Sequence, residues 1–390
     1  MIHIKYCDLK SSSSESQASL ISSSSESQAS LISIENIFQA WNEFKKGKRG
    51  KKDVQNFEIN LEDNLFDLYL KLKNKNYQHS EYKSFYVNDP KRRHIHKACV
   101  SDRVVHHLLY KYLYWLFDKT FIFDSYSCRL EKGTHRGVRR LSVFIRKVSK
   151  NYTGSCWVLK CDIKKFFATV DQTILLKLIK EKVDDEDVYW LLEKIVKSFS
   201  SDFGKSKGIP LGNLTSQIFA NIYMNELDQF IKHKLGIKYY LRYADDFVIL
   251  SEDRDYLEGL IFKISDFLES DLKLSLHENK VIIGKYTRGI DFLGYIVLPY
   301  IILPRTKTKK RMFRKLREKV NLLSFNQSLQ SYLGYLSHAN SYNLTKEVKK
   351  LLTVSCDTGT EIDQLKASVI AVNTNILTYP RNCDVFIPNK

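Results

Sequence analysis

The sequence contains no long apolar run and no paired-cysteine motif. None of its apolar segments approaches the roughly 20 residues that a membrane-spanning helix needs, and its first residues lack the apolar stretch of a signal peptide. Its seven cysteines are scattered, with no Cys-x-x-Cys pair, which argues against a zinc site. We therefore expect no membrane partner, reduced and mostly buried thiols, and a cytoplasmic location.

Two common catalytic signatures are also missing. The chain has no Gly-x-x-x-x-Gly-Lys-Ser/Thr segment, which disfavours a P-loop ATPase. No cysteine and histidine have the spacing that would support a Cys-His nucleophile. If the protein works on phosphates, other groups must carry the chemistry.

The composition is that of a basic globular protein. The 390 residues include 43% hydrophobic and 27% charged residues, enough for two or three domains with sizeable cores. Lys and Arg number 62 against 44 Asp and Glu, a net charge of +18. Such an excess favours a polyanionic partner. With a membrane partner disfavoured, nucleic acid is the partner we expect.

The N-terminal part divides into a leader and a helical region. Residues 11–32 are one eleven-residue Ser-rich unit written twice. Such sequence buries too little apolar surface to offset its ordering entropy, so we expect residues 1–33 to be flexible. From Ser33 the apolar spacing becomes helical, and a longer helix is expected over 101–117. Between them, residues 85–95 predict a hairpin that turns at Pro90.

An acidic pair lies at the centre of the segment 238–250. Apolar and aromatic residues lead up to Asp245-Asp246 and resume directly after it, which predicts a β-hairpin with a tight turn. Two adjacent carboxylates flanked by buried strands are costly unless a cation meets them. Mg²⁺ would do so, since hard cations take oxygen ligands. The alternative is a solvated turn in which the pair only caps the hairpin.

A third carboxylate ends another apolar strand. Asp162 follows the segment 156–161, and if this strand shares a sheet with the hairpin, three carboxylates converge. Phosphoryl transfer by two metal ions about 3.5–4 Å apart needs such a cluster, because the ions activate the attacking hydroxyl and steady the leaving oxygen. The protein then contributes mainly positioning and charge stabilisation.

These features belong to a longer ordered series that resembles the motifs of reverse transcriptases. The resemblance covers roughly residues 34–300 and implies an α+β fold, a right-hand polymerase with fingers, a ferredoxin-like palm and a helical thumb. The segments that carry it are Pro90–Ile95, Asp102–His107, Ser125–Gly133, Asp162–Phe167, Gly208–Gln217, Tyr243–Asp246, Lys280 and Phe292–Tyr295.

The resemblance also implies domain boundaries. After the leader, residues 34–155 would form the N-terminal extension and fingers. Residues 156–300 would form the palm, with part of the fingers at about 172–208. A helical thumb would follow over 301–350, and a C-terminal tail over 351–390.

Site residues follow from the same motifs, position by position. Asp162, Asp245 and Asp246 would be catalytic and, together with Ile163, would bind two Mg²⁺ ions. Phe167 matches the steric gate that excludes a ribose 2′-OH. The residues expected to contact the incoming dNTP are Arg93, Arg129, Phe167, Leu211, Gly212 and Lys280. Those expected to grip template and primer are Lys307, Lys309, Lys310, Arg311, Arg314 and Arg317, for which a solvated basic face is the alternative.

The segment Leu211–Gln217 bears on the subfamily. Most reverse transcriptases have Gln-Gly and later Ser-Pro here, whereas this chain has Leu-Gly and Ser-Gln. That variant resembles diversity-generating retroelements, whose enzymes copy a template RNA with errors at adenines. Leu211 in place of Gln removes an amide beside the nucleotide, and fewer polar contacts weaken discrimination. Leu211 and Gln217 are therefore the expected fidelity residues. Ala244 departs from the pattern, since that group more often has Met.

We thus expect an RNA-directed DNA polymerase that makes adenine-mutagenised cDNA in a bacterial, phage or archaeal cell. Its partners would be template RNA, cDNA, dNTPs and, by resemblance only, a basic accessory variability protein oligomer. A group II intron or retron reverse transcriptase is the alternative within the class. An RNA-binding or defence protein that kept the fold without synthesis is the alternative outside it.

Overall fold

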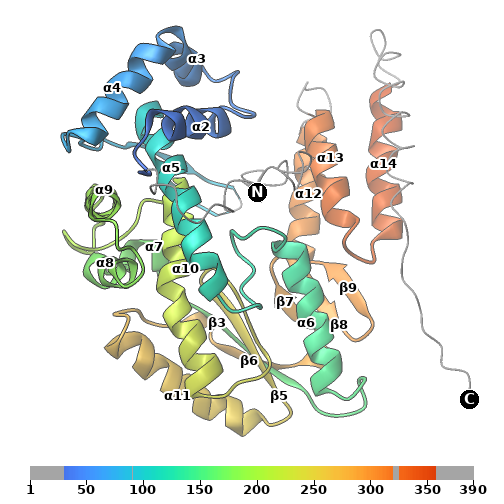
Figure 1. Cartoon of the computed structure of the whole chain (residues 1–390). Coiled ribbons are helices and arrows are strands. Elements are labelled where there is room, and N and C mark those ends of the chain that lie inside the picture. Colours follow the sequence, from blue (N-terminus) through green and yellow to red (C-terminus); the bar gives the residue numbers. More distant parts are fainter. Residues whose placement is uncertain (1–29, 90, 319–324, 357–390) are drawn as a thin grey trace, which may run out of the picture. The chain divides into compact units, whose positions relative to one another are not determined.

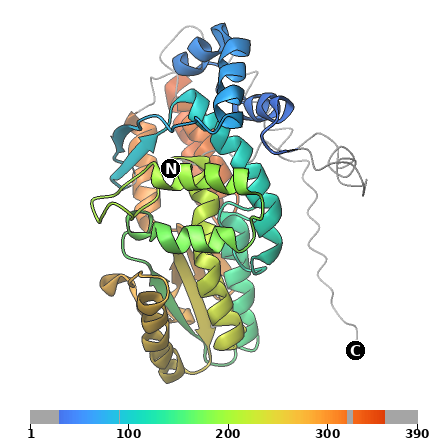
Figure 2. The same ribbon diagram turned by 60° about the vertical axis from the view of Figure 1, so that its left-hand side comes forward.

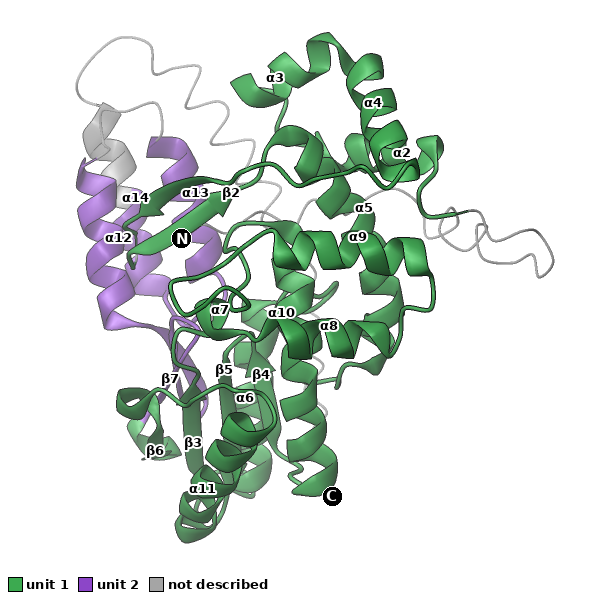
Figure 3. Ribbon diagram, turned by 90° about the vertical axis from the view of Figure 1, so that its left-hand side faces the viewer, with its two compact units in different colours: residues 1–288 green, residues 289–390 purple. Residues whose placement is uncertain are grey.

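The structure, a computed structural model, describes residues 30–89, 91–318 and 325–356, with side chains up to residue 349. The chain divides into two compact units, residues 1–288 and 289–390 (Figure 3). Most of the predicted Ser-rich leader and most of the C-terminal tail lie outside the described residues. None of the helices in the described part is both long enough and apolar enough to cross a membrane.

Helices form the N-terminal part of the first unit. Helix α2 (Ile34–Phe44) begins where predicted, because the Ser33 hydroxyl accepts a hydrogen bond of 3.2 Å from the Asn36 amide. Its buried side chains recur at helical spacing and pack with those of α3 (Lys52–Ile59), α4 (Leu61–Lys73) and α5 (Val100–Phe117). These helices gather around one end of α5 (Figure 1).

A two-stranded hairpin follows α4. Strands β1 (Lys83–Val87) and β2 (Arg93–Lys97) pair antiparallel, with Phe85 opposite Ile95. The hairpin agrees with the sequence prediction. Its side chains are mostly exposed. The apolar residues that predicted these strands are therefore not part of a hydrophobic core.

The central sheet contains β3 (Trp157–Asp162), β4 (Tyr240–Tyr243), β5 (Asp246–Ser251) and β6 (Ile282–Lys285) in the order β4-β5-β3-β6, all antiparallel. Helix α10 (Leu214–Gln229) precedes β4, and α11 (Arg254–Ser270) joins β5 to β6. The chain order βαββαβ with this strand order is ferredoxin-like, as the sequence predicted. A short π-helix, η2 (Phe230–Lys234), extends α10.

The two faces of this sheet are covered differently (Figures 1 and 2). Leu159, Cys161, Phe247 and Ile249 face one side and share a core with α10 and α11. Because strand side chains alternate, Asp162 and Asp246 face the other side. That side is covered over β4 and β5 by α6 (Thr134–Val148). Helices α7 (Phe166–Thr169), α8 (Gln172–Lys180) and α9 (Glu186–Lys197) are inserted between β3 and α10.

The second unit has its own sheet and helices. Strands β7 (Ile290–Phe292), β8 (Tyr295–Leu298) and β9 (Ile301–Pro304) form a separate antiparallel sheet. The tight turn Leu293-Gly294 has positive φ at both residues, which suits a hairpin. Helices α12 (Thr306–Glu318), α13 (Phe325–Leu336) and α14 (Tyr342–Cys356) follow. The division at Arg288/Gly289 precedes the predicted palm boundary at residue 300, because β7 and β8 pair with β9 and not with the palm sheet.

Candidate active site

Two neighbouring strands bring the predicted carboxylates together. Asp162, the last residue of β3, lies directly opposite Asp246, the first residue of β5. Residues so paired in an antiparallel sheet have Cα atoms about 4.5–5.5 Å apart and side chains on the same face. Asp245 precedes Asp246 in the two-residue turn between β4 and β5. The first turn residue, Ala244, has a φ of 54°, a left-handed conformation that a β-hairpin turn requires.

The three carboxylates repel one another in a partly desolvated place. Burial, and next the charge of Asp162, raise the pKa of the Asp245 carboxyl above its usual range. Burial raises the pKa of Asp246 to about 7; the positive charge of Lys160 opposes this rise, and the charges of Asp245 and Asp162 add to it. The cluster therefore has more negative charge than its surroundings compensate.

Lys280 supplies part of the missing positive charge. Its Nζ lies 2.7 Å from Asp162 Oδ1, and the Asp162 side chain is only 14% exposed. The backbone places the lysine, since the His277 amide donates to the Asp162 carbonyl at 2.8 Å and Lys280 follows in the short helix η3 (Glu278–Lys280). The predicted dNTP-contacting lysine thus lies beside the carboxylates.

The donor set fits Mg²⁺ in its chemistry but not in its present geometry. Hard divalent cations take carboxylate and carbonyl oxygens. Burial first, and then mutual repulsion, raise the pKa values of Asp245 and Asp246, and a bound cation would offset both effects. The side chain of Ile163 is 1% exposed and apolar, so only its backbone carbonyl could take part. Within the described part of the chain, no three His, Cys, Asp or Glu side chains are arranged as the ligands of a metal ion.

A sharp turn separates Phe167 from the end of β3. Lys165 adopts a left-handed conformation with a φ of 49°, which ends the strand path and starts α7. Phe166 is buried in the core, whereas Phe167 stays half-buried. The Phe167 carbonyl accepts a hydrogen bond of 2.8 Å from the Ile209 amide. The predicted gate residue is thereby attached to the loop that leads to Leu211.

The loop Gly208–Asn213 is tied at its other end to the β1–β2 hairpin. The His96 amide of β2 donates to the Leu211 carbonyl at 2.9 Å. Gly212 has a φ of 119°, and a Cβ at this position would lie 2.8 Å from Ile95 Cγ2. Only glycine fits both the backbone conformation and the close approach. Leu211 is half-buried and Gly212 exposed, so both lie at the surface of this junction.

Asn213 is a positioning residue that the sequence did not single out. Its Nδ2 donates to the His96 carbonyl at 2.9 Å, and its Oδ1 accepts from the Ala98 amide at 3.3 Å. The residue precedes α10, where Asn often caps a helix, yet it makes no side-chain cap bond. No signal in the sequence indicated this role, because the partners of Asn213 lie more than 100 residues away.

The two predicted arginine contacts differ. Arg93 on β2 lies close enough for its charge to lower the pKa of Asp245. Arg129 does not fit the predicted triphosphate contact. Its Nε donates to Asp118 Oδ1 at 2.6 Å and its Nη1 to the Ile122 carbonyl at 2.7 Å, and the side chain is 8% exposed. These bonds make Arg129 part of the packing between α5 and the following loop.

The remaining predicted residues lie on two helices. Gln217 is half-buried in the first turn of α10. In the second unit, α12 buries Thr308, Met312 and Leu316, and its exposed side is strongly basic. The predicted nucleic-acid contacts that are exposed are Lys307, Lys310, Arg314 and Arg317. Lys309 and Arg311 are half-buried.

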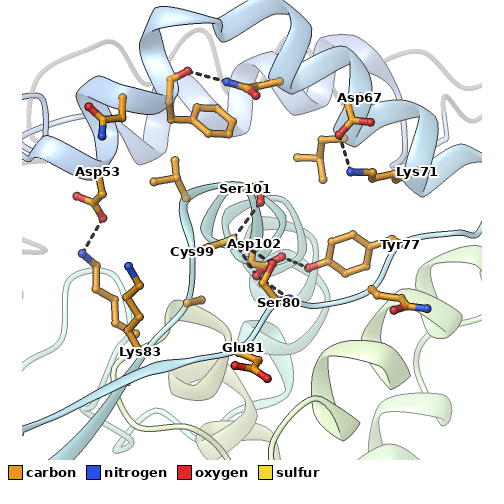
Figure 4. A pocket seen from close by; sticks show the side chains of 18 residues that line it. Asp53, Asp67, Lys71, Tyr77, Ser80, Glu81, Lys83, Cys99, Ser101 and Asp102 are labelled. Carbon is orange, nitrogen blue, oxygen red and sulfur yellow. Dashed lines mark hydrogen bonds and ion pairs between the residues drawn. The ribbon is translucent and has the colours of Figure 1, made fainter.

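A cavity of about 600 Å³ lies away from the carboxylates, between α3, α4 and the start of α5 (Figure 4). Asp102 on its floor is buried and accepts hydrogen bonds from the Tyr77 hydroxyl at 2.7 Å and the Ser80 amide at 3.0 Å. Asp53 and Asp67 each bind a lysine. The cavity contains none of the predicted site residues.

A ferredoxin-like sheet that brings paired carboxylates to the ends of two neighbouring strands, with an arginine of the β1–β2 hairpin near enough to act on Asp245, is the arrangement of right-hand nucleic-acid polymerases. Residues 83–297, more than half of the chain, match the family described as "Reverse transcriptase (RNA-dependent DNA polymerase)". The chain belongs to this family, and the predicted fold class is confirmed.

Similar proteins come from bacteria and fungi. Protein YkfC from Escherichia coli (strain K12) is 26% identical over 232 residues, which are 50% of this chain and 60% of YkfC. The group II intron-encoded protein LtrA from Lactococcus lactis subsp. cremoris is 21% identical over 303 residues, 60% of this chain and 49% of LtrA. Among solved structures, a telomerase from Candida albicans with a fragment of telomeric RNA is 13% identical, with a TM-score of 0.49 over 78% of this chain and 59% of that chain. The chain thus matches between 49% and 60% of the length of these relatives.

The raised pKa of Asp246 gives a testable dependence of stability on pH in the absence of divalent metal. The folded state keeps a proton that the unfolded state, with an ordinary carboxyl pKa near 4, has already released. The free energy of unfolding should therefore fall as pH rises from about 4 to about 7, by roughly 2 kcal/mol or more. Urea unfolding in EDTA at pH 5 and pH 8 measures this.

The Asp246→Asn variant is the matched control, since it should lose this decline. The comparison is needed because burial lowers the pKa of His106 and His107 to about 3. These two histidines make the free energy of unfolding rise with pH, opposite to the effect of Asp246. An equal change of stability with pH in both proteins would contradict the prediction.

Proposed function

We propose that this reverse transcriptase is of the diversity-generating type and makes adenine-mutagenised cDNA from a template RNA. The observation that carries the proposal is Leu211-Gly212 in place of Gln-Gly, followed by Ser216-Gln217. The Leu211 backbone lies at the junction between loop 208–213 and the β1–β2 hairpin, and its apolar side chain is half-buried. A site that offers no amide at this position has fewer polar groups left unpaired by a wrong base, so it rejects that base less strongly.

The chemical roles follow from the site. Asp162, Asp245 and Asp246 would hold two Mg²⁺ ions, with the Ile163 carbonyl as a further oxygen donor. The ions would supply activation of the primer hydroxyl and charge stabilisation of the leaving oxygen. Lys280 and Arg93 add positive charge near the carboxylates, where a triphosphate would bind. Phe167 would exclude a ribose 2′-OH through its ring.

The nucleic acid would bind through the basic helix α12. Its exposed basic residues recur at positions 307, 310, 314 and 317, a spacing that places them along one side of a helix. Such a row of cations suits the phosphate backbone of a template–primer duplex. Template RNA, cDNA and dNTPs are the partners of the proposed reaction. A basic accessory variability protein oligomer would deliver nucleic acid.

A group II intron-type reverse transcriptase is the second candidate. It is favoured by the relatives, since LtrA is named a group II intron-encoded protein and other matches are named intron proteins of yeast. These names describe the matched proteins and not this chain. Leu211 stands against the intron-type candidate, because most reverse transcriptases have Gln at this position. The two candidates predict different error spectra.

Sequencing of cDNA made on a defined RNA template tests the proposal. We expect errors concentrated at template adenines for the wild type. Leu211→Gln should lower the adenine error frequency about tenfold, because the restored amide leaves a polar group unpaired beside a wrong base. Primer extension with all four dNTPs, measured in parallel, should change less than the error frequency.

The exposed Leu130→Gln substitution is a matched control, since it makes the same chemical change away from the loop. Errors spread evenly over the four template bases, or an adenine error frequency unaffected by Leu211→Gln, would defeat the diversity-generating assignment. A cDNA with few errors at any template base would favour the intron-type candidate.

A further inference from the structure

A fully buried ion pair lies behind the turn that carries Asp245. Arg242 on β4 and Asp228 near the end of α10 are both 0% exposed. The guanidinium meets the carboxylate through two parallel hydrogen bonds, Nε to Oδ1 at 2.8 Å and Nη2 to Oδ2 at 2.6 Å. This bidentate geometry fixes the plane of the guanidinium.

All five N–H groups of Arg242 have acceptors. Beyond Asp228, Nη2 donates to Ser125 Oγ at 3.2 Å, and Nη1 donates to Asn221 Oδ1 at 3.3 Å. The last bond runs from Nη1 to the Ala244 carbonyl at 3.0 Å. A guanidinium has five donors in a fixed fork, so the position of this side chain is fully determined.

The Ala244 carbonyl belongs to the catalytic turn. Ala244 has a φ of 54°, a conformation that costs free energy for a residue with a Cβ. Asp245 follows directly, so any relaxation of Ala244 moves the Asp245 carboxylate. The hydrogen bond from Arg242 holds the turn in the strained conformation from the core side of the sheet.

Stability alone does not account for the pair. Taking two charges out of water costs about as much as their attraction returns, and apolar residues of similar volume often stabilise equally well. What the pair provides, and apolar packing does not, is a directed donor at the carbonyl beside Asp245. Tyr240 supports this arrangement, since its hydroxyl donates to Asp228 Oδ1 at 2.6 Å.

We propose that Arg242, oriented by Asp228, is a positioning residue of the polymerase that sets the conformation of the Ala244-Asp245 turn and thereby the Asp245 carboxylate. The inference rests on the proposed role of Asp245 as a metal-binding residue. It assigns to Arg242 no contact with substrate or metal. The side chain acts through the turn.

The test is primer extension at saturating dNTP, titrated with Mg²⁺. Arg242→Lys keeps a positive charge for Asp228 but cannot reach Asp228, Ser125 and Ala244 together. We expect kcat to fall about 100-fold, as for a catalytic group displaced by about 1 Å, and the half-saturating Mg²⁺ concentration to rise severalfold. Asp228→Asn, which keeps the shape of the acceptor, should give a smaller change in the same direction.

Tyr240→Phe and Ser125→Ala are the matched controls. Each removes one bond of the network without touching the Ala244 contact, so the half-saturating Mg²⁺ concentration should stay within twofold of the wild type. A merely structural role would lower the melting temperature and the active fraction but leave the Mg²⁺ dependence unchanged. A wild-type Mg²⁺ dependence in both Arg242→Lys and Asp228→Asn would overturn the proposal.

The same assays distinguish a wrong catalytic role for Asp245 from a wrong positioning role for Arg242. If Asp245→Asn keeps its activity, the role of Asp245 is wrong whatever Arg242 does. If Asp245→Asn is inactive while Arg242→Lys behaves as the wild type, only the positioning role is wrong. Should Arg242→Lys not fold, Asp228→Asn and the two controls give the same comparison.

Discussion

Replacing Asp245 with asparagine is expected to reduce Mg²⁺-dependent primer extension about 1,000-fold or more, a loss of about 4 kcal/mol of transition-state stabilisation. The amide keeps the size of the side chain but offers one neutral oxygen in place of a charged carboxylate, so the site would hold divalent cations weakly. Single-turnover extension of a DNA primer on an RNA template measures the loss. The same substitution tests the electrostatic account of the cluster, because it removes one of three repelling charges.

The fold of the Asp245→Asn variant should be at least as stable as that of the wild type at pH 8 in EDTA, since burial and Asp162 raise the pKa of Asp245. Loss of activity with undiminished stability separates a catalytic role from a structural one. Asp266→Asn, an exposed change on α11, is the control and should leave both quantities unchanged. Primer extension by Asp245→Asn at the wild-type rate would refute the two-metal site.

Replacing Phe167 with alanine should admit ribonucleotides. Without the ring, the 2′-OH of a ribonucleotide meets no obstacle, and the preference for dNTPs over rNTPs should fall about 100-fold, or about 3 kcal/mol of discrimination. The ratio of kcat/KM for dNTP and rNTP is the quantity to measure. Because Phe167 is only half-buried, the cost in folding stability should be smaller than for the neighbouring core residue Phe166.

Phe203→Ala provides the matched aromatic control for the steric gate. Phe203 is 46% exposed, in the loop that precedes Gly208, and its removal should leave sugar discrimination unchanged. If Phe167→Ala incorporates dNTPs normally and still excludes ribonucleotides to the same degree, Phe167 is not the gate.

The sequence predicted the features that depend on local pattern. Near-continuous apolar runs at 156–161 and on both sides of Asp245-Asp246 predicted the strands. The three carboxylates at the ends of these runs were expected to converge if the strands shared one sheet. The register that places Asp162 and Asp246 opposite each other follows from the pleat, since a slip by one residue would turn Asp162 into the core. Lys280 was predicted near the site by resemblance, and it pairs with Asp162.

What the sequence could not predict are contacts between distant polar residues. Arg129 stands in a motif that suggested a triphosphate contact, but Asp118 and nearby carbonyls take its donors. Asn213 binds β2 across more than 100 positions, and Arg242 binds Asp228 between two elements of the core. Hydrogen bonding depends on side-chain directions in the folded chain, and no periodicity in the sequence encodes those directions.

The backbone bonds that join β2, loop 208–213 and Phe167 have an evolutionary consequence. The residue proposed to read the sugar and the residue proposed to influence base choice are connected by a few short, rigid links, so a substitution that shifts one will displace the other. Sugar selectivity and copying accuracy should therefore show epistasis, with paired changes at positions 167 and 211 departing from the sum of their separate effects. A lineage that relaxes its accuracy here would be constrained in how it does so by the need to keep ribonucleotides out.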